Sequence, residues 1–267
     1  MIFWPPWRKP KVGLVLGGGV ARGIAHIGVI KALASYKVPI DYIAATSAGA
    51  LVGAVYAAGL DINLLEEIVQ RIKWSDFFRF TLFRPGFTSP AAIEDFVVKY
   101  IGDIEFKDLK IPFAAAATDI RTGERVVINS GKVAKAVASS ATFPGVFAPG
   151  VLEGKYLIDG GIASNVPVDL AREMGADYVI ASDVIPETTI NVLPGEAMQV
   201  LGRALDLVLK KLQREEAGRA DTLIELKMEA EDIWHLDLHK ARKLIAAGEV
   251  AAHRLSRKIR QDLRLKV

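Results

Sequence analysis

Short uninterrupted apolar runs, each followed by a stretch with helical spacing, constrain the fold of this chain most. The runs "VGLVL" (12–16), "YIAAT" (42–46) and "YVIASD" (178–183) lack the polar alternation of a half-exposed strand. Such runs are typical of strands that are buried on both faces of a sheet. Between them apolar residues recur at helical spacing, as in "IAHIGVIKALASY" (24–36). This alternation predicts an α/β fold in which helices cover both faces of a mostly parallel sheet.

The chain has 267 residues, and we find no internal repeat, low-complexity segment or linker that divides it. We expect an N-terminal segment rich in aromatic and basic residues over 1–10, followed by a single α/β domain over 11–267. The stretch from Trp74 to Ser89 is rich in Phe and Arg without a clean period, and it is predicted to be a cap or loop. Two amphipathic helices are predicted over 195–218 and 238–263.

The run "DYIAATSAGALVGAVYAAGL" (41–60) has no charged residue between its first aspartate and Asp61, which raises the question of a membrane span. About 20 apolar residues can cross a bilayer, and Gly49 and Gly53 match the small-residue spacing of packed membrane helices. However, Ala and Gly supply most of the run, with few large side chains to drive insertion. We therefore favour a buried strand followed by a helix that approaches the sheet closely.

Composition and charge exclude several classes of function. The absence of cysteine excludes disulfides, thiolate catalysis and Cys-ligated metal, and no clustered ligand set suggests another metal or cofactor. The net charge of +3 is small and the basic residues are dispersed, so no nucleic-acid partner is expected. The N-terminus "MIFWPPWRKP" lacks the basic region and the long apolar core of a signal peptide. We expect a cytoplasmic protein.

The first candidate site is the glycine loop "GGGVARG" (17–23), which lies between a predicted strand and a predicted helix. Consecutive glycines and a helix N-terminus favour the binding of negative charge. One interpretation is a dinucleotide site, but the strict G-x-G-x-x-G pattern is absent because its middle glycine would fall at Val20. The ribose-binding acid should also end the second strand, whereas Asp41 precedes it. The other interpretation is an oxyanion hole, which uses the same amides.

Two further motifs carry candidate catalytic side chains. "ATSAG" (45–49) places Ser47 at a strand-to-helix junction and resembles the nucleophile elbow G-x-S-x-G, with Ala45 in place of the first glycine. "LIDGG" (157–161) ends an apolar strand with Asp159. Taken alone, Ser47 can be a structural serine and Asp159 a simple turn residue. A nucleophilic serine also requires a base.

Histidine is the usual base, and the chain has four. His26 lies one turn into the first predicted helix, where it faces either the glycine loop or the core. His235, His239 and His253 lie in or near a charged amphipathic segment and are predicted to face solvent. The order Ser47, Asp159, His235 formally matches the triad of α/β-hydrolases, but no apolar strand end presents that histidine.

Four segments together resemble the patatin-like phospholipase family, and the similarity extends from Lys11 to Val184. They contain the glycine loop, the serine elbow and the Asp-Gly-Gly motif in order: "GLVLGGGVARGIAHIGVIKAL", "IAATSAGALVGAVYAAG", "IPFAAAATDIRTGERVV" and "YLIDGGIASNVPVDLAREMGADYVIASD". The later segment "ARKLIAAGEVAA" is similar to small bacterial members. The resemblance implies a three-layer αβα fold and a Ser–Asp dyad that needs no histidine.

The resemblance also assigns roles to individual residues. It implies that Ser47 is the nucleophile and that Asp159 is the base. Because Asp159 ends an apolar strand, we expect burial to raise the pKa of its carboxyl. The oxyanion hole would be formed by three amides, those of Gly17, Gly18 and Gly19. Arg22 matches the basic residue of the family's glycine loop and is predicted to bind substrate.

The implied substrate is a lipid or another long-chain acyl ester, for which the apolar cap is suited. The alternative is a lipid-binding or regulatory member of the same fold that lacks catalysis. We also predict that residues 1–10 anchor the protein peripherally at a membrane surface, since Trp rings and basic side chains favour lipid headgroups. The competing interpretation is that these rings pack on the domain itself.

Overall fold

The computed structural model describes residues 8–77, 88–186, 194–227 and 237–265. Its strands are β1 Val12–Leu16, β2 Tyr42–Thr46, β3 Phe113–Asp119, β4 Arg125–Ile128, β5 Gly150–Leu152, β6 Lys155–Asp159, β7 Tyr178–Asp183 and β8 Thr222–Glu225. Its α-helices are α1 Ala25–Ser35, α2 Ala48–Ala57, α3 Ile62–Val69, α4 Ala91–Ile101, α5 Val133–Ser140, α6 Gly161–Ser164, α7 Val168–Glu173, α8 Ala197–Gly218 and α9 Ala241–Asp262. Short 3-10 helices are η1 Val20–Ile24, η2 Trp74–Phe77, η3 Phe106–Asp108 and η5 Leu238–Lys240.

The described strands form one mixed sheet in the order β5-β6-β3-β2-β1-β7-β8, with β4 also paired to β3. The pairs β3–β2, β2–β1, β1–β7 and β7–β8 are parallel. The antiparallel pairs are β3–β4, β3–β6 and β5–β6, so they all lie at the β3 end of the sheet. The predicted α/β class and mostly parallel centre are therefore confirmed.

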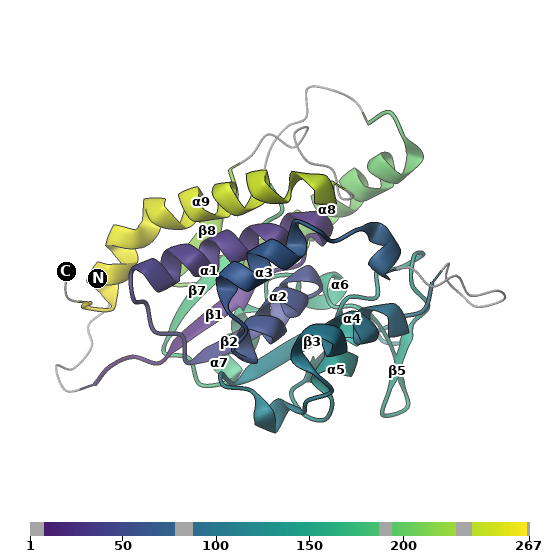
Figure 1. Cartoon of the computed structure of the whole chain (residues 1–267), viewed down its shortest axis with the longest axis horizontal. Coiled ribbons are helices and arrows are strands. Elements are labelled where there is room, and N and C mark those ends of the chain that lie inside the picture. Colours follow the sequence, from purple (N-terminus) through teal and green to yellow (C-terminus); the bar gives the residue numbers. More distant parts are fainter. Residues whose placement is uncertain (1–7, 78–87, 187–193, 228–236, 266–267) are drawn as a thin grey trace.

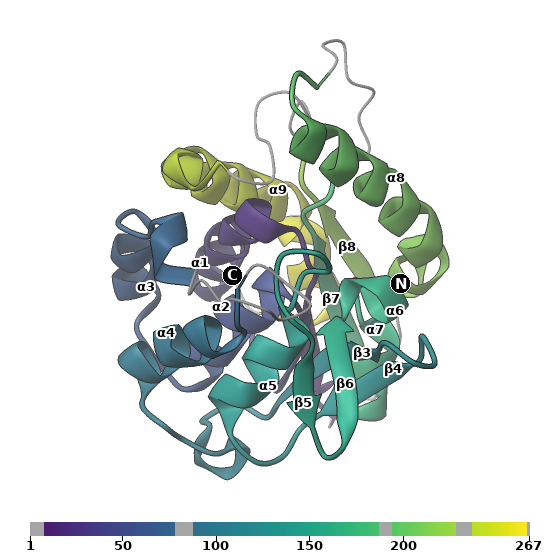
Figure 2. The same cartoon turned by 90° about the vertical axis from the view of Figure 1, so that its right-hand side faces the viewer.

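Helices cover both faces of this sheet, which gives the three layers (Figures 1 and 2). Alternate residues of β1 explain why the run is continuously apolar. Leu14 and Leu16 face a large core shared with α1, α2 and α9, whereas Val15 faces a smaller core shared with α7. All five residues of β1 are buried, because both faces of the strand are covered.

The apolar run 41–60 divides into β2, the junction at Ser47 and the ten-residue helix α2. Gly53 lies against the sheet, where an added methyl group would come 3.1 Å from Ile43 Cγ2. The small-residue spacing therefore serves helix-to-sheet packing. Within the described residues, no helix combines the length and hydrophobicity that crossing a bilayer requires.

Strand register places the ends of β2 and β6 next to each other on one edge of β3. Residues 115 and 116 of β3 pair with both β2 and β4, so these two strands lie on opposite edges. Residues 117 and 118 pair with both β4 and β6, so β6 lies on the same edge as β2. Thr46 pairs with Ala116, and Asp159 pairs with the next residue of β3. The residue after Thr46 is therefore brought beside Asp159.

The predicted anchor falls mostly outside the described residues, which begin at Arg8. Arg8 forms an ion pair with Asp177 at 2.6 Å, and Lys11 forms one with Asp41 at 2.8 Å. These residues precede β1, whereas Ser47 follows the end of β2, which is parallel to β1. Residues 8–11 therefore lie at the N-terminal ends of the parallel strands, whereas Ser47 lies at their C-terminal ends. The anchor role of residues 1–10 stays a prediction, as does the boundary between residues 10 and 11.

Candidate active site

Ser47 occupies a sharp turn between β2 and α2. Its backbone has φ 54° and ψ −124°, a conformation that residues with a side chain rarely adopt and that costs about 1–3 kcal/mol. Its amide contacts Ser140 Oγ at 2.9 Å, and Ser140 Oγ in turn donates to the carbonyl of Ala116. The fold therefore holds the serine in a strained conformation at the end of a buried strand.

Small residues permit this turn. A methyl group added at Gly49 would lie 2.2 Å from the carbonyl oxygen of Leu16, so only glycine fits there. The elbow's first glycine is replaced by Ala45, which belongs to β2 and is fully buried in the larger core. The methyl group of Ala45 packs in the larger core, on the face of the sheet that α1, α2 and α9 cover. The substitution is thus compatible with the fold of the elbow.

Asp159 lies in direct contact with Ser47. Ser47 Oγ donates to Asp159 Oδ2 at 2.5 Å, and both residues are 7% exposed. The other carboxylate oxygen, Oδ1, accepts from the amide of Gly161 at 2.8 Å. These contacts fix both oxygens of the carboxylate and direct one of them at the serine hydroxyl.

The environment of Asp159 changes its acidity. Burial disfavours the charged carboxylate and raises its pKa from 3.8 to about 6, whereas the hydrogen bonds from Ser47 and Gly161 lower it to a smaller extent. The direction agrees with the expectation from the apolar strand that carries the residue. A carboxyl with a pKa near 6 is a better proton acceptor than an ordinary aspartate and is still ionised at neutral pH.

The glycine loop lies beside the nucleophile. A Cβ atom added at Gly18 would come 3.1 Å from Ser47 Cβ and 2.5 Å from Asn165 Oδ1. The amide of Gly17 donates to Ser182 O at 3.0 Å, and the amide of Gly18 donates to Asn165 O at 3.1 Å. The amide of Gly19 donates no hydrogen bond to any residue that the structure describes. Two of the three predicted oxyanion donors are therefore already engaged within the fold, and one is available.

His26 faces the glycine loop rather than solvent. It is fully buried, with Nε2 2.8 Å from the carbonyl oxygen of Gly17 and Nδ1 2.9 Å from Ser182 Oγ. Burial lowers its pKa from 6.5 to about 4, so the imidazole is neutral at physiological pH. A neutral ring that donates to Gly17 O from Nε2 must accept from the Ser182 hydroxyl at Nδ1. The sequence left the orientation of His26 open, and the structure assigns this ring to the support of the loop.

None of the histidines that the structure describes, namely His26, His239 and His253, forms a hydrogen bond with Ser47 or Asp159. The side chain of His253 in α9 contacts the hydroxyl group of Tyr36 at 2.7 Å. His235, the formal triad candidate, lies outside the described residues.

The side chain of Arg22 is buried and lies outside the lining of the cavity beside Ser47, whereas a substrate-binding side chain would have to reach that cavity. It is 3% exposed, and its guanidinium forms two hydrogen bonds with the carboxylate of Asp206 in α8, at 2.9 and 2.7 Å. It does not line the cavity next to Ser47. In this structure the side chain connects the end of the glycine loop to α8, and its predicted role in substrate binding stays a prediction.

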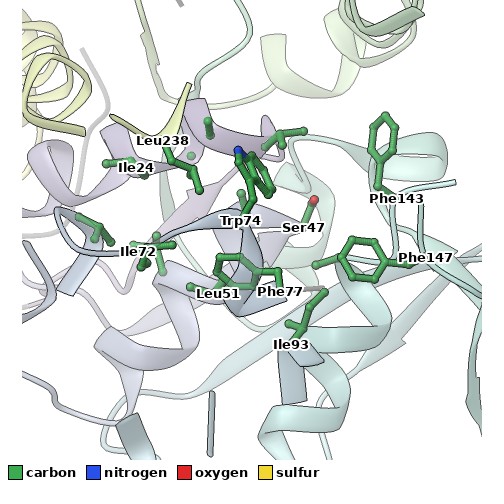
Figure 3. A pocket seen from close by; sticks show the side chains of 17 residues that line it. Ile24, Ser47, Leu51, Ile72, Trp74, Phe77, Ile93, Phe143, Phe147 and Leu238 are labelled. Carbon is green, nitrogen blue, oxygen red and sulfur yellow. The ribbon is translucent and has the colours of Figure 1, made fainter. Parts of the chain in front are cut away.

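An apolar cavity of about 130 Å³ opens next to Ser47 (Figure 3). Its walls come from η1, α2, α3, η2, α4, η5 and the loop after α5. The labelled lining side chains are Ile24, Ser47, Leu51, Ile72, Trp74, Phe77, Ile93, Phe143, Phe147 and Leu238. Apart from the Ser47 hydroxyl and the indole of Trp74, these side chains are hydrocarbon. Trp74 and Phe77 belong to the predicted apolar cap, of which residues 78–87 lie outside the described part.

Comparison with known proteins agrees with this geometry. The patatin-like phospholipase family model matches residues 14–172. A lysophospholipase nte1 of Aspergillus fumigatus is 36% identical over 179 residues, which cover 65% of this chain and 12% of that protein. An uncharacterized NTE family protein of Mycobacterium bovis is 38% identical over 178 residues, which cover 65% of this chain and 49% of that protein. The chain thus spans at most about half the length of these relatives.

Solved structures show the same fold at low sequence identity. VipD from Legionella pneumophila superposes with a TM-score of 0.61 at 13% identity, over 94% of this chain and 67% of VipD. The type III effector protein ExoU superposes with a TM-score of 0.51 at 14% identity, over 96% of this chain and 54% of ExoU. Because the family model covers more than half of the sequence, including the glycine loop, the serine elbow and Asp159, the chain belongs to the patatin-like phospholipase family.

Proposed function

We propose that this protein is a lipid acyl hydrolase that cleaves carboxylic esters with Ser47 as nucleophile and Asp159 as base. The observation that carries the proposal is the 2.5 Å hydrogen bond from Ser47 Oγ to Asp159 at the edge of an apolar cavity. Family membership supports the same reaction class, since the name of the matching family describes phospholipases.

In the first half of the reaction, Ser47 Oγ attacks the acyl carbonyl carbon while its proton moves to Asp159 Oδ2. The carbonyl oxygen becomes an oxyanion, which the amide of Gly19 is available to stabilise. Gly17 and Gly18 support the hole by holding the shape of the loop, and the N-terminus of α2 adds positive potential. When the intermediate collapses, the bond to the alcohol breaks and Asp159 returns the proton to the leaving oxygen.

In the second half, water attacks the acyl-enzyme and gives its proton to Asp159. The acyl–Ser47 bond then breaks, the carboxylic acid leaves, and the serine recovers its proton from Asp159. Each step uses the same oxygen of the carboxylate, and no histidine takes part. This assignment requires the carboxylate to be ionised at the start of each half-reaction.

In this proposal the acyl chain binds in the apolar cavity beside Ser47. The cavity's volume of about 130 Å³ is close to that of an engineered apolar cavity of about 150 Å³ that binds benzene, so it holds roughly six carbons. Longer chains must extend beyond it. The substrates in this proposal are lipids, including phospholipids and lysophospholipids.

A fluorophosphonate probe tests the nucleophile, because it reacts covalently with an activated serine and far more slowly with an ordinary one. We expect mass spectrometry to locate the adduct on Ser47, and we expect Ser47→Ala and Asp159→Asn each to lower hydrolysis of p-nitrophenyl hexanoate by about three orders of magnitude or more. Ser130→Ala, in an exposed loop, is the matched control and should retain activity. An unlabelled protein that purifies with bound lipid would instead support the non-catalytic lipid-binding alternative.

The acyl assignment is tested by narrowing the cavity. Leu51 lines it from α2, so Leu51→Trp should reduce turnover of the hexanoate ester more than that of the acetate ester, by about tenfold in the ratio of kcat/KM. An equal loss on both esters would show that the acyl chain binds elsewhere.

A further inference from the structure

The helix α8 has its polar face buried and its apolar face exposed, the reverse of an ordinary surface helix. Four side chains of the inner face make polar contacts with neighbouring elements: Asp206, Lys210, Gln213 and Glu216. Asp206 is 3% exposed and Gln213 is 4% exposed. The inner face is therefore fixed by hydrogen bonds and ion pairs to the body of the protein.

The outer face of α8 carries a patch of exposed aliphatic side chains. The patch consists of Val200, Leu201, Leu207, Val208 and Leu212, which are between 47% and 64% exposed. These are five of the twelve large hydrophobic residues that are exposed in the described part of the chain. They extend over about 18 Å of helix. A contiguous apolar patch of this kind marks an interaction site more often than an ordinary surface.

Basic side chains border the patch. Lys211 and Arg214 are exposed, and neither forms an ion pair with any residue that the structure describes. Two exposed acids lie near the patch: Glu215, which is paired with Arg219 at 3.6 Å, and Glu196, whose carbonyl oxygen accepts from the amide of Val200. An apolar helix face that also presents exposed Lys and Arg side chains is typical of helices that lie in the headgroup region of an anionic bilayer.

We propose that the outer face of α8 is the surface by which this protein binds an anionic lipid membrane. A second copy of the chain fits less well, because a stable dimer interface uses about 20–30 residues on each side, and cations would face cations across a symmetric contact. Figure 2 shows α8 on the outside of the molecule, on the side of the sheet opposite α3 and α4.

The location of the patch connects it to the candidate active site. Asp206 on the inner face contacts Arg22, which lies three residues after Gly19. A bilayer on the outer face would therefore lie about one helix diameter, roughly 10–12 Å, from the guanidinium of Arg22. Residues 8–11, in contrast, lie at the N-terminal ends of the parallel strands.

The test is sedimentation with vesicles of phosphatidylcholine and phosphatidylglycerol in equal parts. We expect the double variant Leu207→Gln/Leu212→Gln to bind at least about tenfold more weakly than the parent, and Lys211→Gln/Arg214→Gln to lose the preference for these vesicles over pure phosphatidylcholine. The matched control is Val250→Gln, which removes an exposed aliphatic side chain (49% exposed) from α9 and should bind like the parent. Gln is chosen because it favours helix as Leu does.

Size-exclusion chromatography, together with the sedimentation result, separates this proposal from its alternatives. Size-exclusion chromatography reports the oligomeric state, and a parent dimer that the Leu207→Gln/Leu212→Gln variant dissociates would overturn the proposal in favour of a second copy. A parent that does not sediment, or a double variant that sediments like the parent, would also overturn it. Vesicle binding is measured without hydrolysis, so a failure of Ser47 as nucleophile leaves this result unaffected. Hydrolysis of a soluble acetate ester should be unchanged in all of these variants.

Discussion

Hydrolysis should depend on pH through the carboxyl of Asp159. Burial raises the pKa of this group from 3.8 to about 6, and the proposed base must be ionised to accept the proton of Ser47. With a pKa of about 6, only about one eleventh of the protein has the ionised base at pH ~5, whereas more than nine tenths would have it with an ordinary aspartate. We therefore expect kcat/KM to be constant above about pH 7 and to fall about tenfold per unit below the midpoint.

The raised pKa of Asp159 also predicts that the stability of the fold falls with rising pH, whereas activity rises. Because the folded state binds this proton more tightly than the unfolded state, Asp159 stabilises the fold below its unfolded pKa of about 3.8, and that contribution is lost as pH rises through about 6. The shift of about two units corresponds to about 3 kcal/mol. The free energy of unfolding of Asp159→Asn, relative to the parent, should therefore increase by about this amount between pH ~4 and pH ~7.

Two assays together check this reasoning. Initial rates on p-nitrophenyl acetate give the activity midpoint, and urea unfolding of parent and variant at each pH gives the stability difference. A histidine could also produce a midpoint near 6, so the profile should be repeated with His235, His239 and His253 replaced together by Asn. A midpoint near 4, or one that disappears in the triple variant, would refute the assignment of the base to Asp159.

Three further outcomes are expected. The triple replacement of His235, His239 and His253 should leave the rate on a soluble ester within a few-fold of the parent, and a loss of about three orders of magnitude would restore the triad hypothesis. Gly49→Ala should destabilise the protein by about 2–3 kcal/mol in urea unfolding, because its methyl group would meet a backbone carbonyl at 2.2 Å; Gly218→Ala, which meets nothing within 4 Å, should be neutral. Deletion of Met1–Pro10 tests the predicted N-terminal anchor as a membrane contact separate from α8: it should weaken sedimentation with anionic vesicles and slow hydrolysis of vesicle lipid, yet spare a soluble ester. A lower melting temperature together with lower activity on both vesicle lipid and the soluble ester would show that the segment is structural.

Local patterns in the sequence were sufficient for the α/β fold and for the candidate catalytic residues. The apolar run of β1, the strand-to-helix junction at Ser47 and the strand that ends at Asp159 are all visible within windows of a few residues, because period and glycine placement are local properties. Resemblance to a family then suggested which serine and which aspartate belong together.

Tertiary structure decided how those parts meet. Ser47 and Asp159 are 112 residues apart, and they touch because β2 and β6 share one edge of β3. The engagement of the Gly17 amide by a carbonyl of β7 and the pairing of Arg22 with Asp206, 184 residues away, likewise depend on contacts that local sequence does not encode.

The orientation of α8 is the clearest case of a feature that only the fold determines. Its sequence shows that one face is polar and the other apolar, and burial of the apolar face would be the ordinary expectation. The structure buries the polar face instead, because Arg22, Asp183 and Asn165 offer charged and amide groups that Asp206 and Gln213 satisfy. Periodicity alone reveals that a helix has two different faces, whereas the groups already present on the neighbouring surface decide which face is buried.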